Sequence, residues 1–139
     1  MKKIIIFIFL IFNILTITHA LSLENGAELD KLFKELKKSK VLPTSQNIEK
    51  KIWKIWETHP SNDRKGFRLT ELLDQGSLLI NRGELNKAYQ IFTQIIAADP
   101  NWSEAWNKRA LSLYLMGRYQ SSLDDINITL TLESRHFGA

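Results

Sequence analysis

Residues 69–102 read LTELLDQGSLLINRGELNKAYQIFTQIIAADPNW, and residues 103–136 read SEAWNKRALSLYLMGRYQSSLDDINITLTLESRH. The two stretches have the same length and a similar order of apolar, small and turn residues. Pairs of positions 34 residues apart carry the echo: Leu72 and Trp106, Gly76 and Ala110, Leu79 and Leu113, Gly83 and Gly117, Leu85 and Tyr119, Ala88 and Ser122, Phe92 and Ile126, Ile96 and Leu130. A fixed period of this length indicates one supersecondary unit copied in tandem.

Each stretch predicts two helices joined by a tight turn. Apolar residues recur at helical spacing before and after Gly83 and Gly117, and no segment alternates with the period of two that is typical of a strand. We expect the first helix of the pair to begin at Leu69, with residues 64–67 as a linker. Pro100 stops the second helix, because proline disrupts a helix interior. Helices of this length joined by short turns pack antiparallel, so the sequence predicts an all-α fold.

Both stretches resemble the tetratricopeptide repeat (TPR), whose pattern is W-x2-L-G-x2-Y, then A-x3-F, then P. The first stretch carries the pattern on Leu72, Gly76, Leu79, Gly83, Ala88, Phe92, Ile95 and Pro100. The second carries it on Trp106, Ala110, Leu113, Gly117, Tyr119, Ser122 and Ile126. The core leucine of the family is Gln75 or Arg109 here, and Ser134 replaces the second closing proline. The resemblance over residues 69–136 implies antiparallel helix pairs stacked as a short TPR-like right-handed solenoid, with repeat 1 at 69–102 and repeat 2 at 103–136.

Residues 21–65 predict an N-terminal helix pair. Its first helix has an apolar stripe of Leu29, Leu32, Phe33 and Leu36, and its second buries Ile48, Ile52, Trp53, Ile55 and Trp56 as core residues. We expect Pro43 to separate the two helices, with Thr44 or Ser45 as the cap. The pair is either a degenerate third repeat or a capping element.

The C-terminal edge of the predicted array lacks a following unit. Residues 137–139 correspond to the start of a further unit, which predicts a truncated array or an edge covered by a partner or a second copy. A bare edge requires the last helix to turn its polar residues outward, namely Asp124, Asp125, Asn127 and Thr129.

Residues 1–20 have the pattern of a secretory signal peptide. A basic start at Lys2 and Lys3 precedes an apolar run over 4–17, and Thr18-His19-Ala20 ends with a small residue as at a cleavage site. The run is shorter than the roughly 18 residues expected of a spanning helix. We therefore expect export across the inner membrane, and the Lys-, Ile- and Asn-rich composition favours a bacterial periplasm. An uncleaved membrane anchor is the alternative.

Charge and cysteine content exclude several classes of function. Without Lys2 and Lys3, 17 of the 19 basic residues remain against 15 acidic ones, too small an excess to indicate nucleic-acid binding. A basic cluster of Lys31, Lys34, Lys37, Lys38 and Lys40 is interpreted as a solvated helix face, the alternative being weak contact with an anionic membrane surface. The absence of cysteine excludes disulfides, zinc–thiolate sites and a thiol nucleophile.

The sequence offers no catalytic constellation. His59 and His136 have no metal-like partner at helical spacing and are expected to be loop or terminus residues. Adjacent Asp124 and Asp125 point apart on a helix, so paired acid–base chemistry is not expected. We predict that the protein is not an enzyme and needs no cofactor or metal. Arg109, at a normally apolar position, is expected to snorkel or to pair with Asp124 or Asp125, because an unpaired buried charge is costly.

In the TPR family, ligands lie along the first helix of each unit. The resemblance therefore implies peptide-binding positions Thr70, Leu73, Asp74, Ser77, Ile80 and Asn81 in repeat 1, and Glu104, Asn107, Lys108, Leu111, Tyr114 and Leu115 in repeat 2. An alternative is that several of these side chains pack against a further unit. The resemblance implies an exported adaptor or scaffold that binds a protein or peptide through this concave surface. The alternatives are a homo-oligomerising module that uses the C-terminal edge and a membrane-tethered scaffold.

Overall fold

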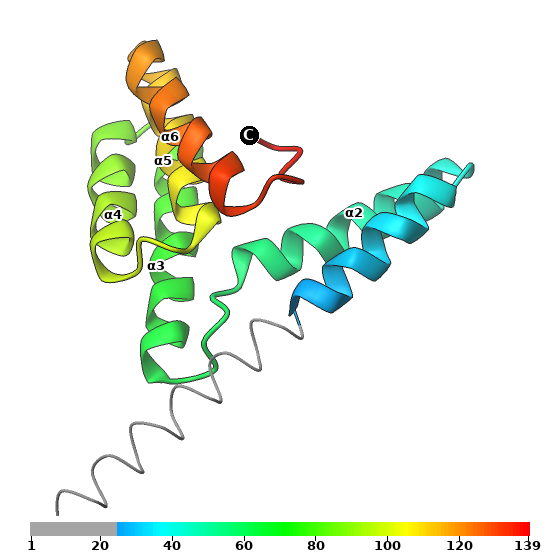
Figure 1. Cartoon of the computed structure of the whole chain (residues 1–139). Helices are drawn as coiled ribbons and strands as arrows, with labels where there is room; N and C mark the ends of the chain where they lie inside the picture. The colour runs from blue at the N-terminus through cyan, green and yellow to red at the C-terminus, as the bar shows by residue number, and fades with distance from the viewer. Residues whose placement is uncertain (1–24) are drawn as a thin grey trace, which may run out of the picture. The chain divides into compact units, whose positions relative to one another are not determined.

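The computed structural model of the chain describes residues 25–139, which form helices and turns without a strand (Figure 1). A first helix covers residues 25–38 of this part. It is followed by α2 (Leu42–Glu57), α3 (Arg64–Asn81), α4 (Leu85–Ala98), α5 (Ser103–Leu115) and α6 (Tyr119–Leu132). The all-α prediction is confirmed, and the predicted signal segment lies outside the described residues.

The chain divides into two compact units between Gly66 and Phe67. In the first, helix 25–38 and α2 form a hairpin (Figure 1) whose buried core consists of Leu29, Leu32, Ile48, Ile52 and Trp56. Trp53 meets Trp56 edge-on at 5.4 Å between ring centroids. The two tryptophans therefore serve as core aromatics, as the apolar stripe predicts.

Two helix starts differ from the sequence prediction. Pro43 lies in the first turn of α2 rather than before it, where its missing N–H costs no helical hydrogen bond, and Val41 is the N-cap. Helix α3 begins at Arg64 instead of Leu69. The Asp63 side chain accepts a 2.7 Å hydrogen bond from the Gly66 N–H, and this cap extends the helix by more than one turn.

The second unit contains most of α3 together with α4, α5 and α6, and its main core lies between α3, α4 and the start of α5. The core cluster consists of Leu69, Leu73, Ala88, Phe92, Ile95, Ile96, Trp102 and Ala105. Gly76 lets α3 approach α4 closely, because a Cβ atom there would lie 2.5 Å from the Phe92 ring. Helix α4 packs against α5, and α5 packs against α6.

The turns inside the two helix pairs have the same geometry. Gly83 and Gly117 both have φ of 75°, which glycine adopts without strain. Each glycine N–H donates a 2.9 Å hydrogen bond to a carbonyl three residues earlier, on Ile80 and Tyr114 respectively. The 34-residue echo in the sequence is therefore also an echo in the backbone.

Helix α6 does not turn all of its polar residues outward. Asp124 and Asn127 are exposed, but Asp125 and Thr129 are buried. Leu123, Leu130 and Leu132 are exposed on the same helix, so α6 meets the requirement for a bare C-terminal edge only in part.

Candidate functional site

The twelve positions implied by the family resemblance lie on α3 and α5, and they differ in accessibility. Leu73, Glu104 and Asn107 are buried. The half-buried members are Thr70, Ser77, Ile80 and Lys108, and the exposed members are Asp74, Asn81, Leu111, Tyr114 and Leu115. The buried three cannot contact a ligand in this conformation, so a binding surface would consist of the other nine.

Exposed apolar side chains gather toward the C-terminal end of α5. Leu111, Tyr114 and Leu115 keep 42%, 59% and 47% of their side-chain exposure. The Tyr114 ring lies 5.5 Å from the ring of Tyr119, which begins α6 and is itself exposed. Aromatic residues with solvated hydroxyls and apolar rings are enriched in protein interfaces, so this end of α5 has suitable chemistry for binding a protein.

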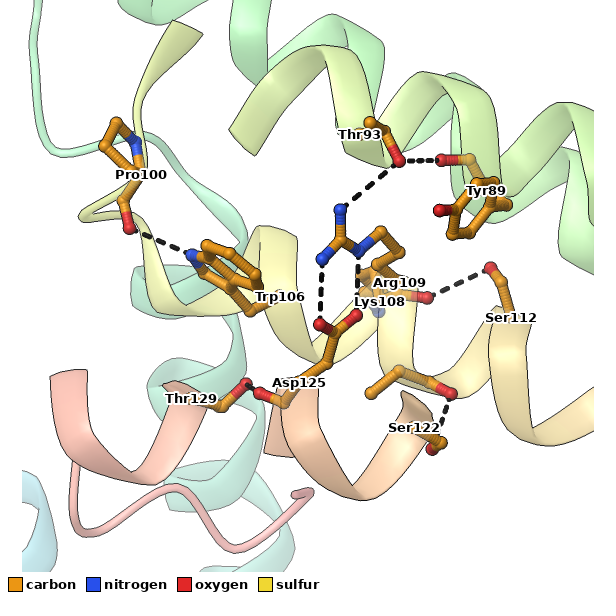
Figure 2. A network of polar contacts seen from close by, with 11 residues as sticks. Tyr89, Thr93, Pro100, Trp106, Lys108, Arg109, Ser112, Ser122, Asp125 and Thr129 are labelled. Atoms are coloured by element: carbon orange, nitrogen blue, oxygen red, sulfur yellow. Dashed lines mark hydrogen bonds and ion pairs between the residues drawn. The ribbon is translucent and has the colours of Figure 1, made fainter. Parts of the chain in front are cut away.

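Arg109 connects three helices through the only normally apolar position of α5 that carries a charge. Its guanidinium donates two hydrogen bonds to the Asp125 carboxylate, at 2.7 Å from Nε and 2.8 Å from Nη2 (Figure 2). Nη1 donates a 3.4 Å hydrogen bond to the Thr93 hydroxyl of α4. The predicted pairing of Arg109 is confirmed, with Asp125 as its partner.

Aromatic rings complete the surroundings of this guanidinium. Its central carbon lies 4.8 Å from the ring centre of Trp106 and 5.7 Å from that of Tyr89. The hydrogen bonds that the guanidinium donates to Asp125 raise the pKa of Arg109 above its ordinary value, although burial acts in the opposite direction. Arg109 therefore links α4, α5 and α6, although its side chain keeps some contact with solvent.

A second polar network lies at the start of α5 and includes a residue near the C-terminus. Glu104 and His136 have fully buried side chains, and Glu104 Oε2 lies 2.7 Å from His136 Nε2. The same oxygen accepts a 3.1 Å hydrogen bond from Asn107, and Lys108 Nζ lies 3.3 Å from Glu104 Oε1. A carboxylate with these three partners can be buried at acceptable cost.

Both histidines lie outside the helices, as predicted, but the structure buries them and gives each a hydrogen-bond partner. His136 is only 2% exposed and His59 only 7%, and the His59 Nδ1 atom accepts a hydrogen bond from the Ser61 N–H. The repeat register contains a signal for His136, because 34 residues earlier it corresponds to Trp102, a core residue at the start of α5. Residue type alone conceals this role.

Within residues 25–139, no group of three or more His, Cys, Asp or Glu side chains could hold a metal ion. Among the same residues, no helix is long and apolar enough to cross a bilayer.

Comparison with known proteins supports the repeat interpretation. The chain is 32% identical over 111 residues to a TPR repeat-containing protein from Rhizobium etli, a match that covers 80% of this chain and 52% of that protein. It is also 36% identical over 42 residues to an uncharacterized protein from Methanocaldococcus jannaschii, covering 30% of this chain and 49% of that protein. No protein-family model and no solved structure matches.

The chain spans about half the length of the curated relatives that it matches. The resemblance to the TPR family is confirmed by the first of these relatives together with the consecutive helix pairs. The fold is an all-α, TPR-like solenoid.

Proposed function

We propose that this protein is an adaptor that binds a protein or peptide through the first helices of its repeats, with the C-terminal end of α5 as the main contact. The observation that carries the proposal is the exposed apolar group of Leu111, Tyr114 and Leu115 on a family ligand helix. Half-buried Lys108, one turn before Leu111, is already paired with the Glu104 carboxylate, so an apolar segment is the best-matched ligand.

The surface favours apolar contact over recognition of a chain terminus. Its charged members outside the core are Lys108 and Asp74, one of each sign on different helices. A terminal carboxylate would need several donors converging on one point. An extended or helical segment that inserts apolar side chains matches this chemistry better.

The test is capture of partners from the native compartment by the full chain and by a Lys108→Glu/Tyr114→Ala variant whose circular dichroism spectrum and thermal melt match those of the full chain, because Lys108 also pairs with buried Glu104. The matched control is Lys54→Glu/Phe67→Ala, which makes the same charge change and removes an aromatic ring that is 64% exposed elsewhere. We expect the control to retain the captured partners and the α5 variant to lose them. Equal capture by both variants would refute the assignment to α5.

A second candidate function is self-association through the C-terminal edge. The observation in its favour is the exposure of three leucines on α6: Leu123 is 52% exposed, Leu130 37% and Leu132 39%. Light scattering over a concentration series tests it. A dimer that Leu123→Ser converts to a monomer supports self-association, and a monomer at every concentration excludes it.

Export belongs to the proposal as well, and it rests on the sequence pattern of residues 1–20 alone. We expect mass spectrometry of the native protein to find Leu21 at the mature N-terminus, in a bacterial periplasmic fraction. An intact Met1 in the membrane fraction would favour the tethered scaffold instead. We further propose that the protein has no enzymatic activity and requires no cofactor.

A further inference from the structure

The loop that joins helix 25–38 to α2 presents exposed apolar and basic side chains together. We define the hairpin tip as residues 37–47, which read KKSKVLPTSQN. Leu42 is 71% exposed, more than any other large hydrophobic residue of the described chain, and Val41 beside it is 59% exposed. Lys37, Lys38 and Lys40 are exposed immediately before them.

The exposure of Val41 and Leu42 follows from the pattern of the hairpin core. The buried face of α2 is formed by Ile48, Ile52 and Trp56, which recur at four-residue spacing. Neither Val41 nor Leu42 belongs to the hairpin core cluster. Val41 and Leu42 therefore place two adjacent apolar side chains in water, where a partner outside the hairpin can contact them.

The tip has a defined shape rather than a loose one. The Val41 carbonyl accepts hydrogen bonds from the Ser39 hydroxyl, at 3.3 Å, and from the Ser45 N–H, at 3.1 Å. The Ser45 hydroxyl also donates to Ser39 at 3.0 Å. These bonds close the turn and hold Val41 and Leu42 at its outer end.

Charge distinguishes the tip from an ordinary solvated surface. It contains three lysines and no acidic residue, and residues 31–54 as a whole contain eight lysines against two glutamates. No acidic residue lies in the first turn of α2 to neutralise them. The local field is therefore strongly positive, and the tip concentrates positive charge in a chain whose net charge is +4.

We propose that the hairpin tip docks on an anionic lipid surface, with Val41 and Leu42 inserted among the headgroups and Lys37, Lys38 and Lys40 on the lipid phosphates. A bilayer fits better than an acidic protein, because lysine is depleted in protein interfaces and lacks the fork that reads a carboxylate. Lysines around exposed aliphatic residues are suited to anionic bilayers, where charge and apolar insertion add. The hairpin tip shares no residue with the predicted peptide-binding positions on α3 and α5.

The test uses the full chain and a local probe, because residues 1–20 are apolar enough to bind vesicles on their own. The chain has no cysteine, so a single Thr44→Cys substitution places an environment-sensitive fluorophore within the tip. A Gln94→Cys label on the exposed face of α4 is the matched control. Both are titrated with vesicles of phosphatidylcholine containing phosphatidylglycerol, and with pure phosphatidylcholine.

We expect a blue shift for the label at position 44 with the anionic vesicles and none for the label at position 94. Each lysine near an anionic surface is worth about 1 kcal/mol, or about fivefold in partitioning. Lys37→Gln/Lys38→Gln/Lys40→Gln should therefore weaken the shift about 100-fold in lipid concentration. Arg64→Gln/Arg82→Gln/Arg118→Gln removes the same charge outside the tip and should leave it unchanged.

A second pair of variants separates insertion from charge attraction. Leu42→Ser should weaken the shift by about fivefold, since half-burying a leucine side chain is worth about 1 kcal/mol. Leu78→Ser, at an α3 side chain that is 54% exposed, should have no effect. No shift at position 44, an equal shift with neutral vesicles, or a shift with polyglutamate but not with vesicles would each overturn the proposal.

Discussion

The interior of repeat 1, formed by α3 and α4, is apolar. The equivalent interior of repeat 2, formed by α5 and α6, carries polar and charged side chains. Positions 34 residues apart show the exchange directly: Ile91 corresponds to Asp125, Ile95 to Thr129, Leu73 to Asn107, Thr70 to Glu104, and Trp102 to His136. Of the second set, all five members are buried. The backbone turns at Gly83 and Gly117 are nevertheless the same.

The difference shows that one backbone can be specified by two kinds of interior. The first repeat is stabilised by apolar surface that folding removes from water, and this kind of stabilisation does not require an exact arrangement of side chains. The second depends on polar groups that are satisfied only in one arrangement, as with Arg109 and Asp125 (Figure 2). Polar interiors add little net stability, but removing one partner is costly because the other stays buried and unpaired. Single substitutions in the two repeats should therefore change the free energy of unfolding by different amounts.

The largest effect is expected from His136→Ala. It removes a fully buried partner of the Glu104 carboxylate and leaves a cavity, and we expect it to lower the free energy of unfolding by about 3 kcal/mol. Urea denaturation followed by circular dichroism measures this. The control is Glu104→Thr/Asn107→Leu/His136→Trp, which gives repeat 2 the residues of repeat 1 at these positions. It should recover at least half of the lost free energy of unfolding. A loss below about 0.5 kcal/mol for His136→Ala would show that the pair contributes nothing.

Asp125→Ala should have the next largest effect, about 2 kcal/mol, because the bound guanidinium of Arg109 retains some solvent contact. The double variant Arg109→Gln/Asp125→Ile carries the residues that repeat 1 has at these positions, and it should be more stable than Asp125→Ala. Arg109→Leu alone should preserve the helical fold, since leucine is the family residue at that position. Loss of the helical circular dichroism spectrum in Arg109→Leu would mean that the ion pair is required for folding.

Gly76→Ala tests the comparison from the apolar side. The new methyl group would collide with the Phe92 ring, which is fully buried, and we expect a loss of about 1 kcal/mol after the gain in helix propensity. Repeat 2 has Ala110 in place of Gly76 and the smaller Ile126 in place of Phe92. Gly76→Ala/Phe92→Ile should therefore be closer to wild type in thermal melts than the sum of its single substitutions. Additive losses would rule out this steric coupling.

The sequence predicts the features of this fold that repeat. The period places Gly83 and Gly117 in equivalent turns, the apolar stripes identify buried residues such as Leu32 and Ile52, and the cost of a lone charge predicts a partner for Arg109. These features follow from local periodicity or from a single strong energetic rule.

Features that depend on contacts between side chains far apart in the sequence cannot be predicted from local periodicity. The burial of Glu104 is made favourable by His136, which lies 32 residues away, and no local pattern connects the two. Asp125 and Thr129 look like solvent-facing residues until their partners on α5 and within α6 are known. The predicted peptide-binding positions stay predictions, because exposure shows which of them are accessible and not what they bind.

The smallest effect concerns the connection after α6 and depends on pH. Burial raises the pKa of the Glu133 carboxyl, but hydrogen bonds from the Arg135 side chain and N–H, with the charges of Arg135 and His136, outweigh it and hold the pKa below 4.5. A lowered folded-state pKa stabilises the fold above the unfolded pKa, and this stabilisation is lost as the pH falls through the folded pKa. In repeat 1, Asp99 and Asn101 occupy the equivalent positions, and the Asn101 N–H donates a 2.9 Å hydrogen bond to the Asp99 carboxylate. Arg135→Asn should therefore cost less than about 1 kcal/mol at about pH 6, and the cost should become smaller as the pH falls toward about 3, as measured by urea denaturation. A cost that is the same at both pH values would show that Arg135 acts through packing instead of charge.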